Sequence, residues 1–325
     1  MKLSRRQFVQ IAAAAAAQTA YSPPVLALPY PARPVHFVVG FPPGGASDML
    51  ARLIGQSLSE KLGQQFVVEN RPGASSNIAT ESVVHSPPDG YTLLLVNAAN
   101  AINVTLYKNL NFDFTRDIAP VAGIIRAPLV MVVNSSFPAK TIAEFIAYAR
   151  VNGSNISMAT AGNGSSPHVA GELFKMMSEI KLVDVPYRGG SPALMDLLGN
   201  QVQVMFSTIA SSIGYIRSGK LRAIGVTTAK RSEVLPGVPT IGEHLPGYEA
   251  SDWYGIGAPK GTPVDIVDML NREVNLALTD AKLVTRLADV GGTALIVSTS
   301  NFKKFVAEEV EKWGHVVKFS GAQAA

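Results

Sequence analysis

The chain has 325 residues, of which 47% are hydrophobic and none is cysteine, and a formal net charge of +4. The lack of cysteine excludes disulfides, thiol nucleophiles and cysteine metal sites. Residues 1–27 hold three basic side chains and no acidic one. The rest of the chain therefore has 25 basic and 24 acidic residues. A nearly neutral remainder gives no reason to expect nucleic acid as a partner.

The first 27 residues predict an export signal rather than part of the fold. A positive head within residues 1–6 is followed by an apolar stretch at 11–17 and by small residues up to Ala27. This order is typical of a signal peptide that is cut after about Ala27. The apolar stretch is shorter than the ~20 residues that span a bilayer.

The export route has two candidates. Arg5 and Arg6 resemble a twin-arginine motif, which we favour, but Gln10 stands where that motif often has Lys, so the general secretory route stays open. Both routes predict a periplasmic protein. No later segment is apolar for long enough to cross a membrane, so we expect no stable membrane insertion.

Beyond residue 34, short apolar runs alternate with stretches of helical periodicity. The predicted strands are 35–40, 65–69, 92–96, 129–133, 156–160, 182–186, 202–207, 221–226 and 254–258. The predicted helices are 46–62, 77–85, 141–150, 167–178, 190–198, 210–217, 263–278, 281–290 and 300–319. The alternation predicts an α/β fold with parallel sheets covered by helices on both faces.

Two segments, 119–126 and 249–253, are the candidates for strands that cross between two domains. The middle segment 127–251 would then form one domain, and 28–126 plus 252–325 the other. Two crossings would make a hinge with a ligand cleft beside it. A single larger sheet would produce a similar pattern.

Two glycine-rich loops, 40–48 and 161–168, each lie between a predicted strand and a predicted helix. Ligands of open α/β sheets bind at this end of the strands, where free helix N–H groups attract anions. Gly44 and Gly45 let a ligand approach the backbone of the first loop, and Ser165 and Ser166 add hydroxyl donors to the second. Tight turn geometry alone is the alternative explanation for either loop.

Many sequence blocks in one order resemble a known family, the extracytoplasmic solute receptors of tripartite tricarboxylate transporters, or Bug family. The resemblance covers the chain beyond the signal and runs through residues 44–48, 68–74, 88–93, 162–168, 185–189, 221–223, 235–240 and 258–263. Asn200 and Gln203 depart from the family's usual Gly and Asp. Both lie at a predicted helix-to-strand turn.

The resemblance implies a type II-like periplasmic-binding-protein fold, with two α/β domains joined by a two-strand hinge and a ligand cleft between them. It also implies capture of a small organic carboxylate, held by backbone amides and waters, and delivery to membrane permease subunits. No catalytic residue, metal or cofactor is expected, and the protein is expected to be a monomer. The candidate ligand-binding residues are Phe41, Gly44, Gly45, Ala46, Ser47, Asp48, Asn97, Gly162, Asn163, Gly164, Ser165, Ser166, His168 and Ser207.

Several of these residues have a second interpretation. Phe41 could pack in the core, Asp48 could cap its helix or meet a ligand amine, and Asn97 could belong to a turn. His168 could be structural, or it could serve a hydrolase with Ser165 or Ser166, although no Gly-x-Ser-x-Gly elbow occurs. A receptor that signals to a partner protein is a further alternative to transport.

Overall fold

The computed structural model describes residues 30–187, 189–289 and 292–322. The predicted export signal, residues 1–27, lies outside the described residues. The residues from Arg33 onward form one compact unit.

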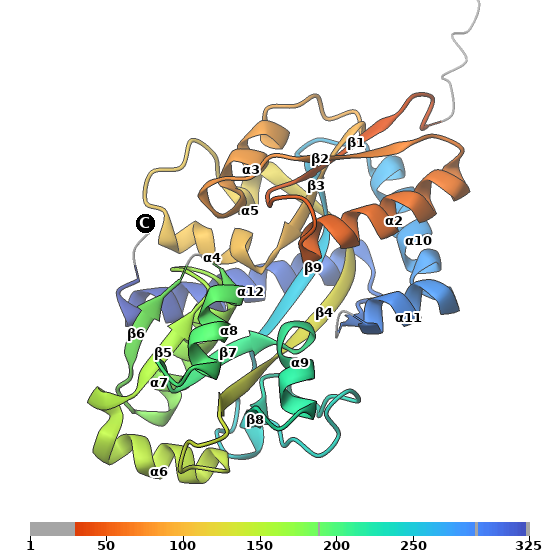
Figure 1. The fold of residues 1–325 in the computed structure, drawn as a ribbon. Helices are drawn as coiled ribbons and strands as arrows, with labels where there is room; N and C mark the ends of the chain where they lie inside the picture. Colours follow the sequence, from red (N-terminus) through yellow and green to blue (C-terminus); the bar gives the residue numbers. More distant parts are fainter. Residues whose placement is uncertain (1–29, 188, 290–291, 323–325) are drawn as a thin grey trace, which may run out of the picture. The chain divides into compact units, whose positions relative to one another are not determined.

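Strands and helices alternate along most of the chain (Figure 1). The strands are β1 Val35–Val39, β2 Phe66–Asn70, β3 Thr92–Asn97, β4 Ile118–Asn134, β5 Ser157–Thr160, β6 Val183–Pro186, β7 Val204–Thr208, β8 Leu221–Val226, β9 Ser251–Pro259 and β10 Thr293–Ala294. The helices are α2 Ala46–Leu62, α3 Asn77–Val84, α4 Ala98–Leu106, α5 Phe114–Asp117, α6 Ile142–Asn152, α7 Ser166–Ser178, α8 Gly190–Leu198, α9 Ile209–Arg217, α10 Val264–Ala277, α11 Ala281–Asp289 and α12 Thr299–Ser320.

The strands form one hydrogen-bonded path in the order β2-β1-β3-β9-β4-β7-β5-β6, and β8 and β10 also pair with β4. Strands β1, β2 and β3 are mutually parallel, as are β5, β6 and β7. Strands β4 and β9 run antiparallel to each other and to their other partners. The prediction of parallel sheets is therefore wrong for these two strands, because an apolar run does not encode its direction.

Strand β4 is longer than any strand the pattern predicted. Its first part, up to Pro128, pairs with β9, and its last part, from Leu129, pairs with β7 and β8. The sequence suggested separate pieces at 119–126 and 129–133, whereas the structure has one continuous strand that includes Pro128. Figure 1 shows β4 and β9 between the strands β1–β3 and the strands β5–β8.

Helix α4 was not predicted from the sequence. Ala98, Ala101, Ile102 and Leu106 are all buried, as are Asn100 and Asn103. A helix buried on most sides has no polar face, so the periodicity that reveals surface helices is missing. Helix α12 packs against α4, α7 and β4, which holds α4 in the core. Within the described residues, no helix is long and apolar enough to span a bilayer.

Candidate functional site

A cavity of about 790 Å³ lies between the loop after β1 and the loop after β5, the two glycine-rich loops of the sequence. Eleven of the fourteen predicted ligand residues line it, and Asp48, His168 and Ser207 do not. The lining comprises residues 41–47, 75, 97, 99, 161–167, 189–191, 252 and 254. We call this space the main cavity.

Four helices begin at the main cavity. Their N-cap residues, which all line it, are Gly45 of α2, Asn97 of α4, Ser165 of α7 and Gly189 of α8. The first N–H groups of a helix have no partner within it and carry about half a positive charge. No side chain caps α2 at Gly45 or α8 at Gly189. These N–H groups are therefore open to an anion.

Asp48 lies beneath the first loop. Its Oδ2 accepts hydrogen bonds from the backbone N–H of Gly44 at 3.0 Å and from Nε of Arg52 at 3.1 Å. Oδ1 accepts from the Arg52 guanidinium at 2.9 Å. The hydrogen bond from Arg52 lowers the pKa of Asp48 to about 2. Asp48 is thus an ionised group that holds the loop, and the structure does not place it at the ligand position that the sequence suggested.

His168 supports the second loop in the same way. The backbone N–H of Gly164 donates to its Nδ1 at 3.0 Å. Burial lowers the pKa of His168, which favours the neutral ring that can accept this bond. The N–H groups of Gly44 and Gly164 are therefore already used, and a ligand must rely on the neighbouring ones.

Asn97 lines the main cavity and has a buried side-chain amide. Its Oδ1 accepts the N–H of Ala99 at 2.9 Å, and its own N–H donates to Asn100 at 2.9 Å, so it caps α4. Its Nδ2 is buried and has no partner among the described residues. A buried amide donor without a partner is costly, and a bound acceptor would satisfy it. Phe41 also lines the cavity, with a half-buried side chain.

Ser207 lies outside the main cavity. It is 1% exposed on β7, and its hydroxyl donates to the carbonyl of Thr208 at 3.2 Å. Side chains alternate between the two faces of a strand, and the sequence could not say which face of β7 meets the ligand. The structure gives Ser207 a structural role.

Asp252 and Tyr254 on β9 line the main cavity and were missed from the sequence. Asp252 accepts hydrogen bonds from Ser166 Oγ at 3.1 Å, from Tyr254 OH at 3.0 Å and from the N–H of Trp253 at 3.1 Å. Burial raises the pKa of Asp252 to about 6. An acid inside an otherwise uncharged strand was the one sequence signal that could have indicated it.

A largely buried charge cluster joins His168, Glu172 and Lys175 of α7 to the exposed Asp184 of β6. Lys175 contacts Glu172 at 2.5 Å and Asp184 at 2.6 Å, and His168 lies 3.7 Å from Glu172. The acids and His168 come within 4.8 Å of one another, as metal ligands do. The Lys175 ammonium already supplies the positive charge between these acids.

This cluster predicts a pH dependence of stability. Burial raises the pKa of Glu172 from 4.5 to about 7, so the folded chain holds a proton that the unfolded chain releases. The free energy of unfolding should therefore fall as pH rises through this window, by at most ~1.4 kcal/mol per pH unit. In urea unfolding between pH 4.5 and 7.5, Glu172→Gln should lack this component. Equal slopes for both proteins would contradict the assignment.

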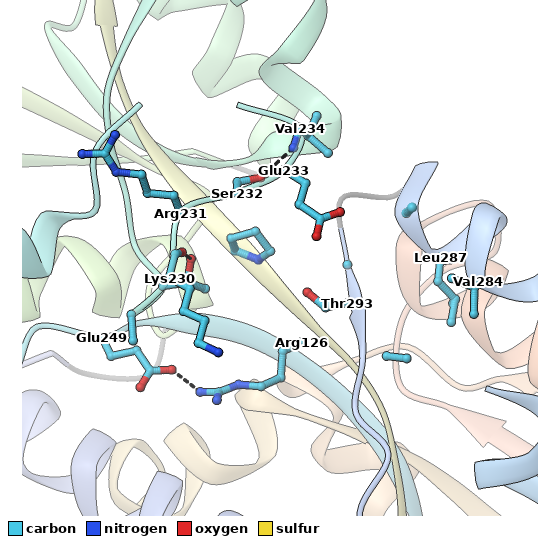
Figure 2. Close-up of a pocket in the computed structure, with 16 residues that line it drawn as sticks. Arg126, Lys230, Arg231, Ser232, Glu233, Val234, Glu249, Val284, Leu287 and Thr293 are labelled. Carbon is cyan, nitrogen blue, oxygen red and sulfur yellow. Dashed lines mark hydrogen bonds and ion pairs between the residues drawn. The ribbon is translucent and has the colours of Figure 1, made fainter. Parts of the chain in front are cut away.

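A second cavity, of about 460 Å³, lies beside Arg126 of β4 and is also lined by the loop 228–234 and by residues 284, 287, 288 and 292–294 (Figure 2). Arg126 is paired with Glu249, and Arg231 is paired with Glu243 at 2.8 Å. None of the described helices has its N-cap in this lining. The main cavity is thus the better candidate for binding an anion.

The chain matches known proteins over most of its length. Residues 50–321 match the family model described as "Tripartite tricarboxylate transporter family receptor". Protein BugT of Bordetella pertussis is 36% identical over 303 residues, which cover 92% of this chain and 93% of BugT.

Solved structures have the same fold. R. palustris Rpa4515 with adipate has a TM-score of 0.80 at 37% identity and covers 90% of this chain and 99% of its own. MatC (Rpa3494) from Rhodopseudomonas palustris with bound malate has a TM-score of 0.76 at 34% identity. The match covers 89% of this chain and 100% of MatC. The periplasmic binding protein BugD has a TM-score of 0.76 at 35% identity. The match covers 90% of this chain and 99% of BugD. The predicted α/β periplasmic-binding-protein fold class is confirmed.

Proposed function

Because the chain belongs to the tripartite tricarboxylate transporter receptor family, whose members are solute-binding receptors and not enzymes, we propose that it captures a small organic carboxylate in the main cavity. It then delivers the ligand to membrane permease subunits of a tripartite transporter. Residues 1–27 direct export to the periplasm and are removed after about Ala27.

The observation that carries this proposal is the convergence of four helix N-termini on one cavity. Two of them, at Gly45 and Gly189, lack a side-chain cap, and the Asn97 amide adds an unpartnered donor. Backbone N–H groups at helix ends bind carboxylates without any cationic side chain. The relatives solved with adipate and with malate support a carboxylate as the ligand.

Capture involves closure about β4 and β9. Within this compact unit, the two domains expected from the sequence are residues 28–126 with 252–325 and residues 127–251, and we propose that these two parts move relative to each other. The first cavity loop follows β1 and the second follows β5, so each domain contributes helix ends to the ligand. Closure excludes bulk water and strengthens these hydrogen bonds, and a ligand that fits only the closed form shifts the population towards it.

The hydrolase alternative is wrong. Nδ1 of His168 accepts the Gly164 N–H, while Ser165 Oγ donates to the Gly162 carbonyl at 2.7 Å and Ser166 Oγ donates to Asp252. No described contact lets the imidazole take a proton from either serine, as a Ser–His pair requires. Membership in a family of receptors agrees with this geometry.

A thermal-shift screen of mono-, di- and tricarboxylates, including adipate and malate, tests the function. A ligand present at 100 times its Kd adds ~2.7 kcal/mol to the free energy of unfolding, which raises Tm by a few degrees. Matched amides and alcohols should leave Tm unchanged. If no carboxylate raised Tm, the binding function would be refuted. Uptake of the best binder by a receptor-deletion strain, with and without this chain, then separates transport from signalling.

A further inference from the structure

One acidic side chain occupies the wall of a cavity that otherwise suits an anion. Asp252 lines the main cavity and also a smaller adjoining cavity of about 270 Å³, which Met49, Ile125 and Ala210 help to line. Among the described lining residues of both cavities, Asp252 is the only Asp, Glu, Lys, Arg or His. A ligand in the main cavity therefore lies beside this carboxyl group.

The hydrogen bonds of Asp252 come from neutral donors alone. Its Oδ1 accepts from Ser166 Oγ and from the Trp253 N–H, and its Oδ2 accepts from Tyr254 OH. Burial keeps the pKa of Tyr254 well above its usual value, so the phenol stays a donor. A carboxyl group offers about four acceptor positions, so room remains on Oδ2 for one more partner from the cavity.

The charged groups on the packed elements do not neutralise Asp252. On β4, Arg126 is paired with Glu249; on α2, Asp48 is paired with Arg52. His168 of α7 accepts the Gly164 N–H. Glu309 of α12 is paired with Lys312 and accepts from two tryptophan indoles, and its charge raises the pKa of Asp252 further.

A carboxylate ligand would therefore meet a second carboxylate with no cation between them in the described surroundings. Two carboxylates that share one site cannot both stay ionised without a large penalty, and they bind one proton between them instead. On the premise that the main cavity binds carboxylates, we propose that Asp252 takes up one proton from solvent when the ligand binds. Its carboxyl group then donates a hydrogen bond to the ligand carboxylate.

Proton uptake by Asp252 should make the affinity for the carboxylate fall as pH rises. With a pKa of about 6 in the free receptor, Asp252 is ionised at neutral pH, so binding there must consume a proton. The Kd should rise as pH increases above 6, by up to about tenfold per pH unit. Below pH 6 the acid is already protonated, and the contribution of Asp252 becomes constant. A receptor built this way releases its ligand more readily at alkaline pH.

Isothermal titration calorimetry of the whole protein measures the number of protons taken up on binding. The ligands are adipate and malate, or the tightest binder of the carboxylate screen. In two buffers of different ionisation enthalpy at pH 7.5, the wild-type protein should take up about one proton per ligand. Asp252→Asn presents an amide where the protonated acid would be, so it should take up none. Its Kd should be flat from pH 6 to 8.5 and at least about tenfold lower than the wild-type value at pH 8.

Asp265→Asn is the matched control, because Asp265 is an exposed acid on α10 outside both cavities. It should retain the wild-type proton uptake. Wild-type binding without proton uptake at pH 7.5 would overturn the proposal, whether or not Asp252→Asn folds. So would Asp252→Asn binding that is weaker at every pH, which would mean that an ionised Asp252 accepts a hydrogen bond from the ligand. If no carboxylate bound either protein at any pH, the proposed function itself would fail.

Discussion

Replacing Gly44 by leucine should weaken carboxylate binding about 100-fold while the protein stays folded. Gly44 lines the main cavity, and a Cβ added to it meets no atom within 4 Å. The leucine side chain would therefore stand in the space that the ligand needs. Loss of two charge-assisted hydrogen bonds, at about 1.5 kcal/mol each, corresponds to an increase in Kd of about 100-fold, which calorimetry with the best carboxylate would show.

Gly63→Leu is the matched control for backbone strain. Gly63 ends the same helix α2 with φ 71°, close to the φ of 85° at Gly44, and its added Cβ also meets no atom within 4 Å. Both variants should lose about 1–2 kcal/mol of stability, the cost of a left-handed conformation for a residue with a Cβ. Only Gly44→Leu should lose binding. Equal Kd values for both variants would show that the first loop is not the ligand site.

Gly164 is a poorer position for such a test, although it looks equivalent in the sequence. A Cβ at Gly164 would lie 2.2 Å from Cδ2 of Leu106 on α4. A bulky residue there would disturb the packing between the second loop and α4, and a loss of binding would not identify its cause. The different surroundings of the two glycines come from the tertiary structure.

Trp253→Ala should cause the largest loss of stability. Trp253 is fully buried on β9, packs edge-to-face against Phe302 and Phe305, and donates its indole N–H to Glu309 at 2.9 Å. Truncation leaves a large cavity and removes a donor from a buried acid, at an expected cost of about 3–5 kcal/mol. Urea unfolding at pH 7 measures this cost as a lower free energy of unfolding.

Trp253→Phe separates the loss of packing from the loss of the indole hydrogen bond. A phenyl ring fills much of the space but cannot donate to Glu309, so this variant should lose only about 1–3 kcal/mol. Glu309 retains the indole of Trp313 at 2.8 Å and the pair with Lys312. A cost for Trp253→Ala below that of Trp253→Phe would contradict the importance of packing at this position.

Local patterns predicted most of the helices and strands. Helix α2 was predicted at its observed bounds, because its apolar residues recur at helical spacing and glycines stand on both sides of it. Helix α8 was likewise predicted at its observed bounds, 190–198. The two glycine-rich loops were predicted for the same reason, since turn residues between a strand and a helix act within a few positions. The direction of β4 and β9 was not predicted, because it depends on partners far away in the chain.

The α/β alternation, the two loops and the family resemblance could be predicted from the sequence alone, because all of them depend on neighbouring residues or on ordered blocks. Which polar groups line the main cavity depends on how distant parts of the chain fold together. It placed Asp48 and His168 beneath the loops and Asp252 in the cavity wall. Ser166 and Asp252 are 86 positions apart and meet because α7 packs against β9. Such contacts arise from strand pairing and helix packing, which no local pattern records.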